Sequence, residues 1–198
     1  MRRLTSIAAT AGLVMPMIIM ATAYGAPPAP MPSPPADAKP KNWTPPSEKI
    51  YAQALSDQIM ARHPELLSVT FHGVPPGSAN LYTMFAGSYP DRVGNPDDPD
   101  DIDVITKGIT IVDPRWHRTQ DATKKFVVQL PLRDSSGANV GLLVLAFRAT
   151  HESNKGPTEL EFFRRAVALR DALQPRIPSY AALFEPAASR AIGKKQAN

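Results

Sequence analysis

The first 46 of the 198 residues contain two segments unsuited to a packed core, so the fold must be built from the residues that follow. Residues 1–25 combine a basic start, an uncharged apolar run from Ile7 to Ala23 and an exit of small residues, which is the pattern of a cleaved secretory signal peptide. Pro16 interrupts this run, which is also slightly shorter than the roughly 20 residues needed to cross a bilayer. We therefore expect a periplasmic or secreted protein, which would contact the membrane only if the signal segment stayed uncleaved.

The second segment, residues 26–46, is dominated by proline, alanine and serine. Proline cannot donate a backbone hydrogen bond, and this stretch lacks the apolar side chains for a core, so we expect an extended linker. The folded domain is expected over residues 47–180, where hydrophobic periodicity is found. Residues 181–198 are expected to form a flexible basic tail.

The chain has no cysteine, which excludes disulfides, thiolate chemistry and zinc or haem sites built on cysteine. The domain must therefore be held together by its hydrophobic core. The formal net charge of +4 falls to about +2 once Arg2 and Arg3 leave with the signal peptide. Such a mild charge does not predict a nucleic-acid partner.

Within the domain, the first half of the sequence predicts two helices and a strand hairpin. The first helix is expected to be capped by Ser47 and to end before Pro64. Residues 67–72 alternate apolar with polar side chains, the period of a half-buried strand, and a long loop connects them to a second strand at 81–86. A short helix then begins at the aspartate cluster and ends at Gly108.

The second half predicts three strands and a terminal helix. The strands are expected at 109–112, 126–132 and 140–147, and the last of these is apolar on both faces, as in a central strand. Thr158 and Glu161 form a capping box that opens the final helix. The predicted class is α+β, with a roughly five-stranded antiparallel sheet and helices against one face.

The turns between these elements resemble those of the PAS-like single Cache domain family of bacterial extracytoplasmic sensor proteins. The resemblance covers residues 64–148 and rests on His72–Gly77, on residues 86–94, on Pro99–Ile102 and on Arg133–Gly137 followed by an apolar strand. It implies a PAS/Cache-like sheet with a long N-terminal helix, a short crossover helix and a C-terminal helix. It also implies a small organic ligand, an acid or an amine, in a pocket between the sheet and the crossover segment.

Five residues are candidates for contacting that ligand. Arg92 is the leading one, because a guanidinium can hold a ligand carboxylate through two hydrogen bonds, although an ion pair with the neighbouring aspartates is the alternative. Tyr82, Ser88 and Tyr89 are expected to line the same pocket. His72 either points into it or lies on an exposed face of the sheet.

The acidic run at residues 97–103 is the most conspicuous polar feature of the chain. Carboxylates of this kind can bind calcium, but their spacing does not fit the common calcium loop and Pro99 restricts the backbone within it. We expect instead that one aspartate caps the short helix and that the others favour its positive end. The sequence thus predicts no metal and no cofactor.

These features favour a small-ligand-binding, sensor-like module without an output domain of its own. Ligand binding would order residues 88–103 and change a surface that a separate protein partner recognises. One alternative is a structural or assembly accessory that makes contacts through a sheet edge and the Pro-rich linker, and another is a small hydrolase. A triad can be drawn from Ser88, His72 and Asp91, but no G-x-S-x-G elbow supports it, so we predict no catalytic residue and no enzymatic activity.

Overall fold

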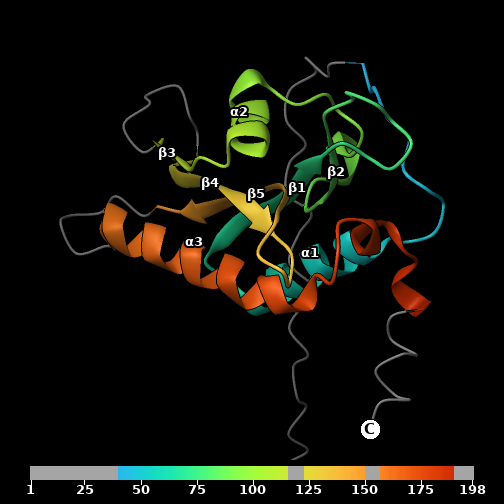
Figure 1. Cartoon of the computed structure of the whole chain (residues 1–198). Coiled ribbons are helices and arrows are strands. Elements are labelled where there is room, and N and C mark those ends of the chain that lie inside the picture. Colours follow the sequence, from blue (N-terminus) through green and yellow to red (C-terminus); the bar gives the residue numbers. More distant parts are fainter. Residues whose placement is uncertain (1–39, 116–122, 150–156, 190–198) are drawn as a thin grey trace, which may run out of the picture. The chain divides into compact units, whose positions relative to one another are not determined.

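The computed structural model describes residues 40–115, 123–149 and 157–189. The expected signal peptide, most of the linker and the last nine residues of the expected tail therefore lie outside the described residues. The chain forms a five-stranded antiparallel sheet and several helices, which confirms the α+β class (Figure 1). In order, the elements are α1 (Tyr51–Arg62), β1 (Leu66–Gly73), β2 (Thr83–Gly87), η1 (Pro90–Arg92), α2 (Pro99–Lys107), β3 (Ile111–Pro114), β4 (Lys125–Arg133), β5 (Asn139–Arg148), α3 (Glu159–Leu173), η2 (Gln174–Arg176) and η3 (Ala181–Phe184).

The strands are arranged in the order β2-β1-β5-β4-β3, so β1 and β5 are neighbours although they are far apart in the sequence. Hairpins join β1 to β2 and β4 to β5, as predicted. The Asp134 carboxylate closes the second hairpin by accepting hydrogen bonds from the amides of Ser136 and Ala138. Gly137 adopts a positive φ of 88° in this turn, which glycine tolerates without strain.

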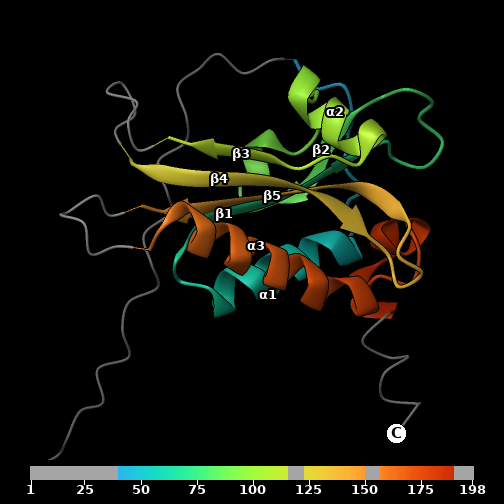
Figure 2. The same cartoon turned by 60° about the vertical axis from the view of Figure 1, so that its left-hand side comes forward.

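The main core lies between one face of the sheet and the helices α1 and α3, which run across that face (Figure 2). The Thr158–Glu161 capping box of α3 is confirmed, as is its buried stripe of Phe162, Ala166, Leu169 and Leu173. The Phe162 ring packs against Phe126 and Phe147, with ring centroids 5.2 and 5.4 Å apart. This aromatic cluster fixes α3 to the two strands β4 and β5.

The expectation that the helices cover one face of the sheet was wrong. Helix α2 packs on the opposite face, over β1, β4 and β5 (Figure 2). All eight residues of β1 are consequently buried, in place of the half-buried alternation expected for residues 67–72. Polar side chains of β1, among them Thr70 and His72, are therefore enclosed between the sheet and α2.

The start of α1 also differs from the prediction. The helix begins at Tyr51, after Ile50, and not at Ser47. Its first amide donates to the carbonyl of Glu185, and Ile50 pairs with Pro186, so the C-terminal segment replaces the expected serine cap. The ordered chain accordingly continues beyond residue 180, and the buried side chains of Ala182 and Leu183 belong to η3.

Residues before 47 also belong to the folded unit. The amides of Asn42 and Trp43 donate to the carbonyl of Gly94 at 2.8 and 3.3 Å. Gly94 has a positive φ of 92°, and a Cβ there would collide with the Trp43 carbonyl. The close approach of these two segments thus requires glycine at position 94.

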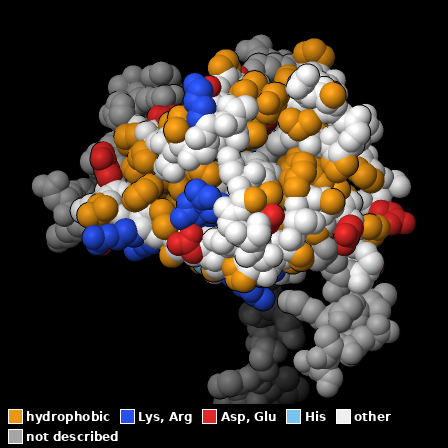
Figure 3. All heavy atoms as spheres, viewed as in Figure 1, with side chains coloured by type: hydrophobic (Ala, Val, Ile, Leu, Met, Phe, Trp, Pro, Cys, Tyr) orange, Lys and Arg blue, Asp and Glu red, His pale blue; other side chains and the backbone are white. Residues whose placement is uncertain are grey.

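The surface of the described residues is mixed in character. On the face shown in Figure 3, lysine, arginine, aspartate and glutamate side chains stand singly or in small groups among apolar and neutral ones. The large apolar side chains that are exposed include Ile109, Val112 and Leu160. None of the described helices has the length and apolar character needed to cross a membrane.

Truncation of the aromatic cluster provides a test of this packing. We expect Phe162→Ala to lower the free energy of unfolding by about 3–5 kcal/mol, because it removes the ring that joins α3 to Phe126 and Phe147. Leu160→Ala, two residues away and 53% exposed, is the matched control and should change it by less than about 0.5 kcal/mol. Urea denaturation followed by circular dichroism measures both, and equal losses would contradict the packing described.

Candidate ligand site at the crossover

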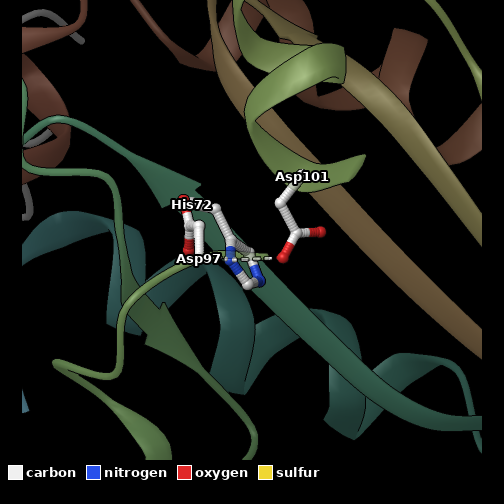
Figure 4. A group of neighbouring side chains, drawn as sticks. All are labelled: His72, Asp97 and Asp101. Carbon is white, nitrogen blue, oxygen red and sulfur yellow. Dashed lines mark hydrogen bonds and ion pairs between the residues drawn. The ribbon is translucent and has the colours of Figure 1, made fainter. Parts of the chain in front are cut away.

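The polar centre of the molecule is His72, near the end of β1. Its side chain faces α2 together with Thr70, because residues two apart on a strand point to the same side. Both ring nitrogens have a hydrogen-bond partner. Nε2 lies 2.7 Å from Thr70 Oγ1. Nδ1 lies 2.7 Å from Asp97 Oδ1 (Figure 4). Since His72 is only 9% exposed, its expected alternative position on an exposed sheet face is wrong.

Asp97 reaches His72 because the chain after η1 runs back along β2. Met84 of β2 donates its amide to the Asn95 carbonyl and accepts at its own carbonyl from the Gly94 amide, and Thr83 Oγ1 also donates to the Asn95 carbonyl. The Asp97 amide then donates to the Tyr82 carbonyl at 3.2 Å. These contacts hold the Asp97 carboxylate against the imidazole ring.

Asp101 approaches the same ring from the first turn of α2. Its Oδ2 atom lies 3.9 Å from His72 Nδ1 and accepts a hydrogen bond from the Asp98 amide at 3.3 Å. Asp98 and Asp101 together form a capping box, which confirms that an aspartate of the acidic run caps this helix. The Oδ1 atom of Asp101 accepts from Gln129 Nε2 of β4 at 2.8 Å. We refer to His72, Asp97 and Asp101 as the His72 cluster.

Two buried oxygen atoms at the His72 cluster have no hydrogen-bond partner among the described residues. One is Asp97 Oδ2, on a side chain that is 0% exposed, and the other is Gln129 Oε1, on a residue that is 7% exposed. An unsatisfied buried polar atom costs about 1–3 kcal/mol, and native proteins rarely leave one without a partner. The cluster therefore has spare capacity to accept hydrogen bonds or to ligate a cation.

The protonation of the cluster is shifted by its surroundings. Burial alone would lower the pKa of His72, but the hydrogen bond to Asp97 and the negative charges of Asp97 and Asp101 outweigh it and raise that pKa above its usual value. Burial raises the pKa of the Asp97 and Asp101 carboxyl groups, and the His72 charge only partly opposes this. The folded protein therefore holds protons at this site more tightly than the unfolded chain does.

Ser88, Tyr89 and Arg92, three of the other predicted ligand residues, make their contacts away from His72. Ser88 uses its Oγ to accept a hydrogen bond from the Val69 amide, and the Arg92 guanidinium lies over the Tyr89 ring, 4.9 Å from its centroid. Tyr82 contributes its carbonyl oxygen to position Asp97. Within the described residues, no hydrogen bond, ion pair or ring contact joins Ser88, Tyr89 or Arg92 to His72.

The chain of contacts from Asp97 through His72 to Thr70 has the order of an acid–base–hydroxyl triad, but Thr70 is buried in the sheet. His72 is bonded to Thr70 and Asp97, and not to Ser88 or Asp91. A buried hydroxyl cannot meet an acyl substrate, so these three side chains do not form a working triad.

Three residues of this site were not predicted from the sequence. The acidic run that contains Asp97 and Asp101 was assigned to helix capping, and Gln129 was given no role at the site. The signal for Gln129 was present, because it is the one polar side chain in the apolar run Phe126–Leu132. For Asp97 no such signal exists, since its direction depends on how the chain returns along β2.

Two groups of side chains have the spacing to hold a metal ion. In the His72 cluster the three ligand atoms all lie within 4.8 Å of one another, and the same holds for Asp98, Asp100 and Asp101. In the second group Asp98 and Asp100 are exposed, and exposed acidic clusters are common without an ion. The buried His72 cluster is therefore the stronger candidate.

No protein-family model matches this chain, and no curated protein is significantly similar to it.

The raised pKa of His72 predicts how stability depends on pH. A group with a higher pKa in the folded state gives its full stabilisation below the pKa of the unfolded chain, about 6.5 for histidine, and loses it as the pH rises through the folded-state pKa. The shifts of Asp97 and Asp101 have the same sign. In buffer with chelator, we expect the free energy of unfolding to fall as the pH is raised above about 6.5.

Urea denaturation at pH 6, 7, 8 and 9 measures this dependence. In His72→Gln the decrease should be smaller, because the imidazole that binds the extra proton is absent. A wild-type protein that becomes more stable over this range, or a variant with an unchanged slope, would show that the His72 ring does not hold its proton as described.

Proposed function

We propose that this protein is an extracytoplasmic, sensor-like module that binds a small cationic ligand at the His72 cluster. The observation that carries the proposal is the fully buried Asp97 carboxylate, which has one oxygen on His72 and the other without a partner among the described residues. Binding without catalysis is proposed, because no hydroxyl or other nucleophile of the cluster is accessible to a substrate.

The position of the cluster supports a ligand-binding role. His72 belongs to the sheet, whereas Asp97 and Asp101 belong to the segment that crosses from β2 to β3, so the cluster lies between the sheet and the crossover (Figure 4). This is where the resemblance to single Cache domains implies a ligand. The PAS/Cache-like assignment, including a long N-terminal helix, is part of this proposal, and the antiparallel sheet preceded by α1 supports it.

The charge of the cluster favours a cation over an organic acid. Asp97 and Asp101 are buried beside His72, and the exposed Asp98 and Asp100 add negative charge close by. A ligand carboxylate would be repelled here, at an energy that grows as water is excluded. An organic acid bound at Arg92, as the sequence suggested, is the alternative that the test below distinguishes.

Ligand binding at this point would connect three parts of the chain. A cation between Asp97 and Asp101 draws the returning segment and α2 onto β1, and so stabilises residues 88–103 against the sheet. The outer surface of α2 then changes when the ligand binds, and a separate protein partner recognises the changed surface. The sequence signals at residues 1–46 support placing this event outside the cytoplasm.

An assembly role is the second candidate, and one observation favours it. Val112 belongs to β3, at the edge of the sheet, and Ile109 lies just before this strand. Both side chains are 42% exposed. An apolar sheet edge can pair with another protein. A co-purifying protein lost on Val112→Lys, combined with no ligand response, would favour this role.

A thermal-shift screen tests the ligand proposal. Small amines, divalent metal ions and organic acids are added separately to the purified protein at pH 7.5. We expect at least one cationic compound to raise the melting temperature, because a ligand that binds only the folded state stabilises it. Organic acids should have no effect.

Two matched variants locate the response. Asp97→Asn keeps the shape of the side chain but removes its charge, and it should abolish the shift. Arg92→Gln removes the candidate for binding carboxylates and should leave the shift unchanged. Stabilisation by organic acids that disappears in Arg92→Gln would instead move the site to η1 and overturn the proposal.

A further inference from the structure

We propose that the cation bound by the His72 cluster is a divalent transition-metal ion of the zinc type, ligated by His72 Nδ1 and the carboxylates of Asp97 and Asp101. This inference rests on the proposed function, because it names the class of cation. It also replaces the sequence-based expectation of no metal, which considered only the spacing within the acidic run.

The three ligand atoms already lie within 4.8 Å of one another. Asp97 Oδ1 lies 2.7 Å from His72 Nδ1, and Asp101 Oδ2 lies 3.9 Å from the same nitrogen. In a tetrahedral site with bonds of about 2.0–2.1 Å, neighbouring ligand atoms are roughly 3.3 Å apart. The distance from His72 Nδ1 to Asp97 must therefore lengthen, and that to Asp101 shorten, by about 0.6 Å each. Small side-chain rotations provide such changes.

The unpartnered oxygens provide the second, independent indication. Asp97 Oδ2 and Gln129 Oε1 are buried acceptors without a donor among the described residues. Asp97 belongs to the His72 cluster, and Gln129 contacts it through the hydrogen bond to Asp101. A metal ion satisfies such acceptors where no protein donor is in reach. Gln129, whose Nε2 contacts Asp101, offers a neutral oxygen, and water can complete the coordination.

The surrounding hydrogen bonds orient the ligands as in established metal centres. With Nδ1 on the metal, Nε2 carries the proton and donates to Thr70 Oγ1 at 2.7 Å, which fixes the ring and its tautomer. Gln129 Nε2 and the Asp98 amide hold the two oxygens of Asp101. Of the three proposed ligands, His72 and Asp101 are thus each held in place by hydrogen bonds from neighbouring residues.

Ligand type and charge determine the class of ion. Calcium and magnesium prefer oxygen ligands alone, whereas an imidazole with carboxylates suits zinc and its neighbours in the first transition row. Neither the Asp97 nor the Asp101 carboxylate forms an ion pair with a lysine or arginine of the described residues. A divalent ion would neutralise both carboxylates while His72 is uncharged.

The test uses the purified protein after removal of metal with a chelator. Isothermal titration with Zn²⁺ should give one site per chain, and Co²⁺ should give visible absorption bands of a low-coordinate site that Zn²⁺ abolishes. Asp97→Asn and Asp101→Asn should each weaken Zn²⁺ binding by at least tenfold. Thr70→Val, which removes the hydroxyl that orients His72, should weaken it by about tenfold.

Asp103→Asn is the matched control, because Asp103 belongs to the same acidic run and helix but pairs with Lys107 away from the cluster. It should bind Zn²⁺ like the wild type, and circular dichroism should show every variant folded. Failure to bind Zn²⁺ or Co²⁺, binding unchanged in Asp97→Asn and Asp101→Asn, or equal competition by Ca²⁺ would each overturn the metal assignment.

The outcome also separates this inference from the proposed function. If amines stabilise the protein through Asp97 but metals do not bind, the cationic site stands and the metal assignment fails. If neither class of cation binds, both proposals fail.

Discussion

The hydrogen bond between His72 and Asp97 connects the two halves of this domain. Its histidine belongs to β1 and its carboxylate to the segment returning along β2, so it holds the crossover and α2 against the sheet. Enclosing charged groups in this way is costly unless they are paired. The raised pKa of His72 reflects how strongly the pair retains a proton, and the unpartnered Asp97 oxygen shows that the pairing is incomplete. The stability of the fold and the proposed binding of a cation thus depend on the same few atoms.

Local patterns were sufficient to predict most elements of the fold. The stripe of α3 and its capping box, the bounds of α2 at the aspartates and Gly108, and the doubly buried β5 all follow from spacing within one segment. The errors arose where a segment distant in the sequence determines the burial of a strand or the cap of a helix. The half-buried prediction for β1 failed because α2 covers its polar face, and the Ser47 cap failed because Glu185 and Pro186 meet the start of α1 instead.

The candidate site was predictable only in part, because some of its contacts are local in the sequence and others depend on distant segments. His72 was identified from its own strand, and the acidic run was recognised as a helix start, which it is. That Asp97 and Asp101 also face His72 follows only from the return of the chain along β2, which no spacing rule describes. Arg92 and Tyr89 were expected to line the ligand pocket, but they contact one another at the start and end of η1.

Gly141 of β5 lies against the backbone of His72. It has a positive φ of 146° in β5, and a Cβ at this position would lie 2.6 Å from the carbonyl oxygen of His72. The absence of a side chain there lets β5 run close against the backbone that carries the imidazole. The spacing between the neighbouring strands β1 and β5 thereby fixes the position of His72. A methyl group at position 141 would push these two strands apart and so shift the imidazole from the neighbouring strand.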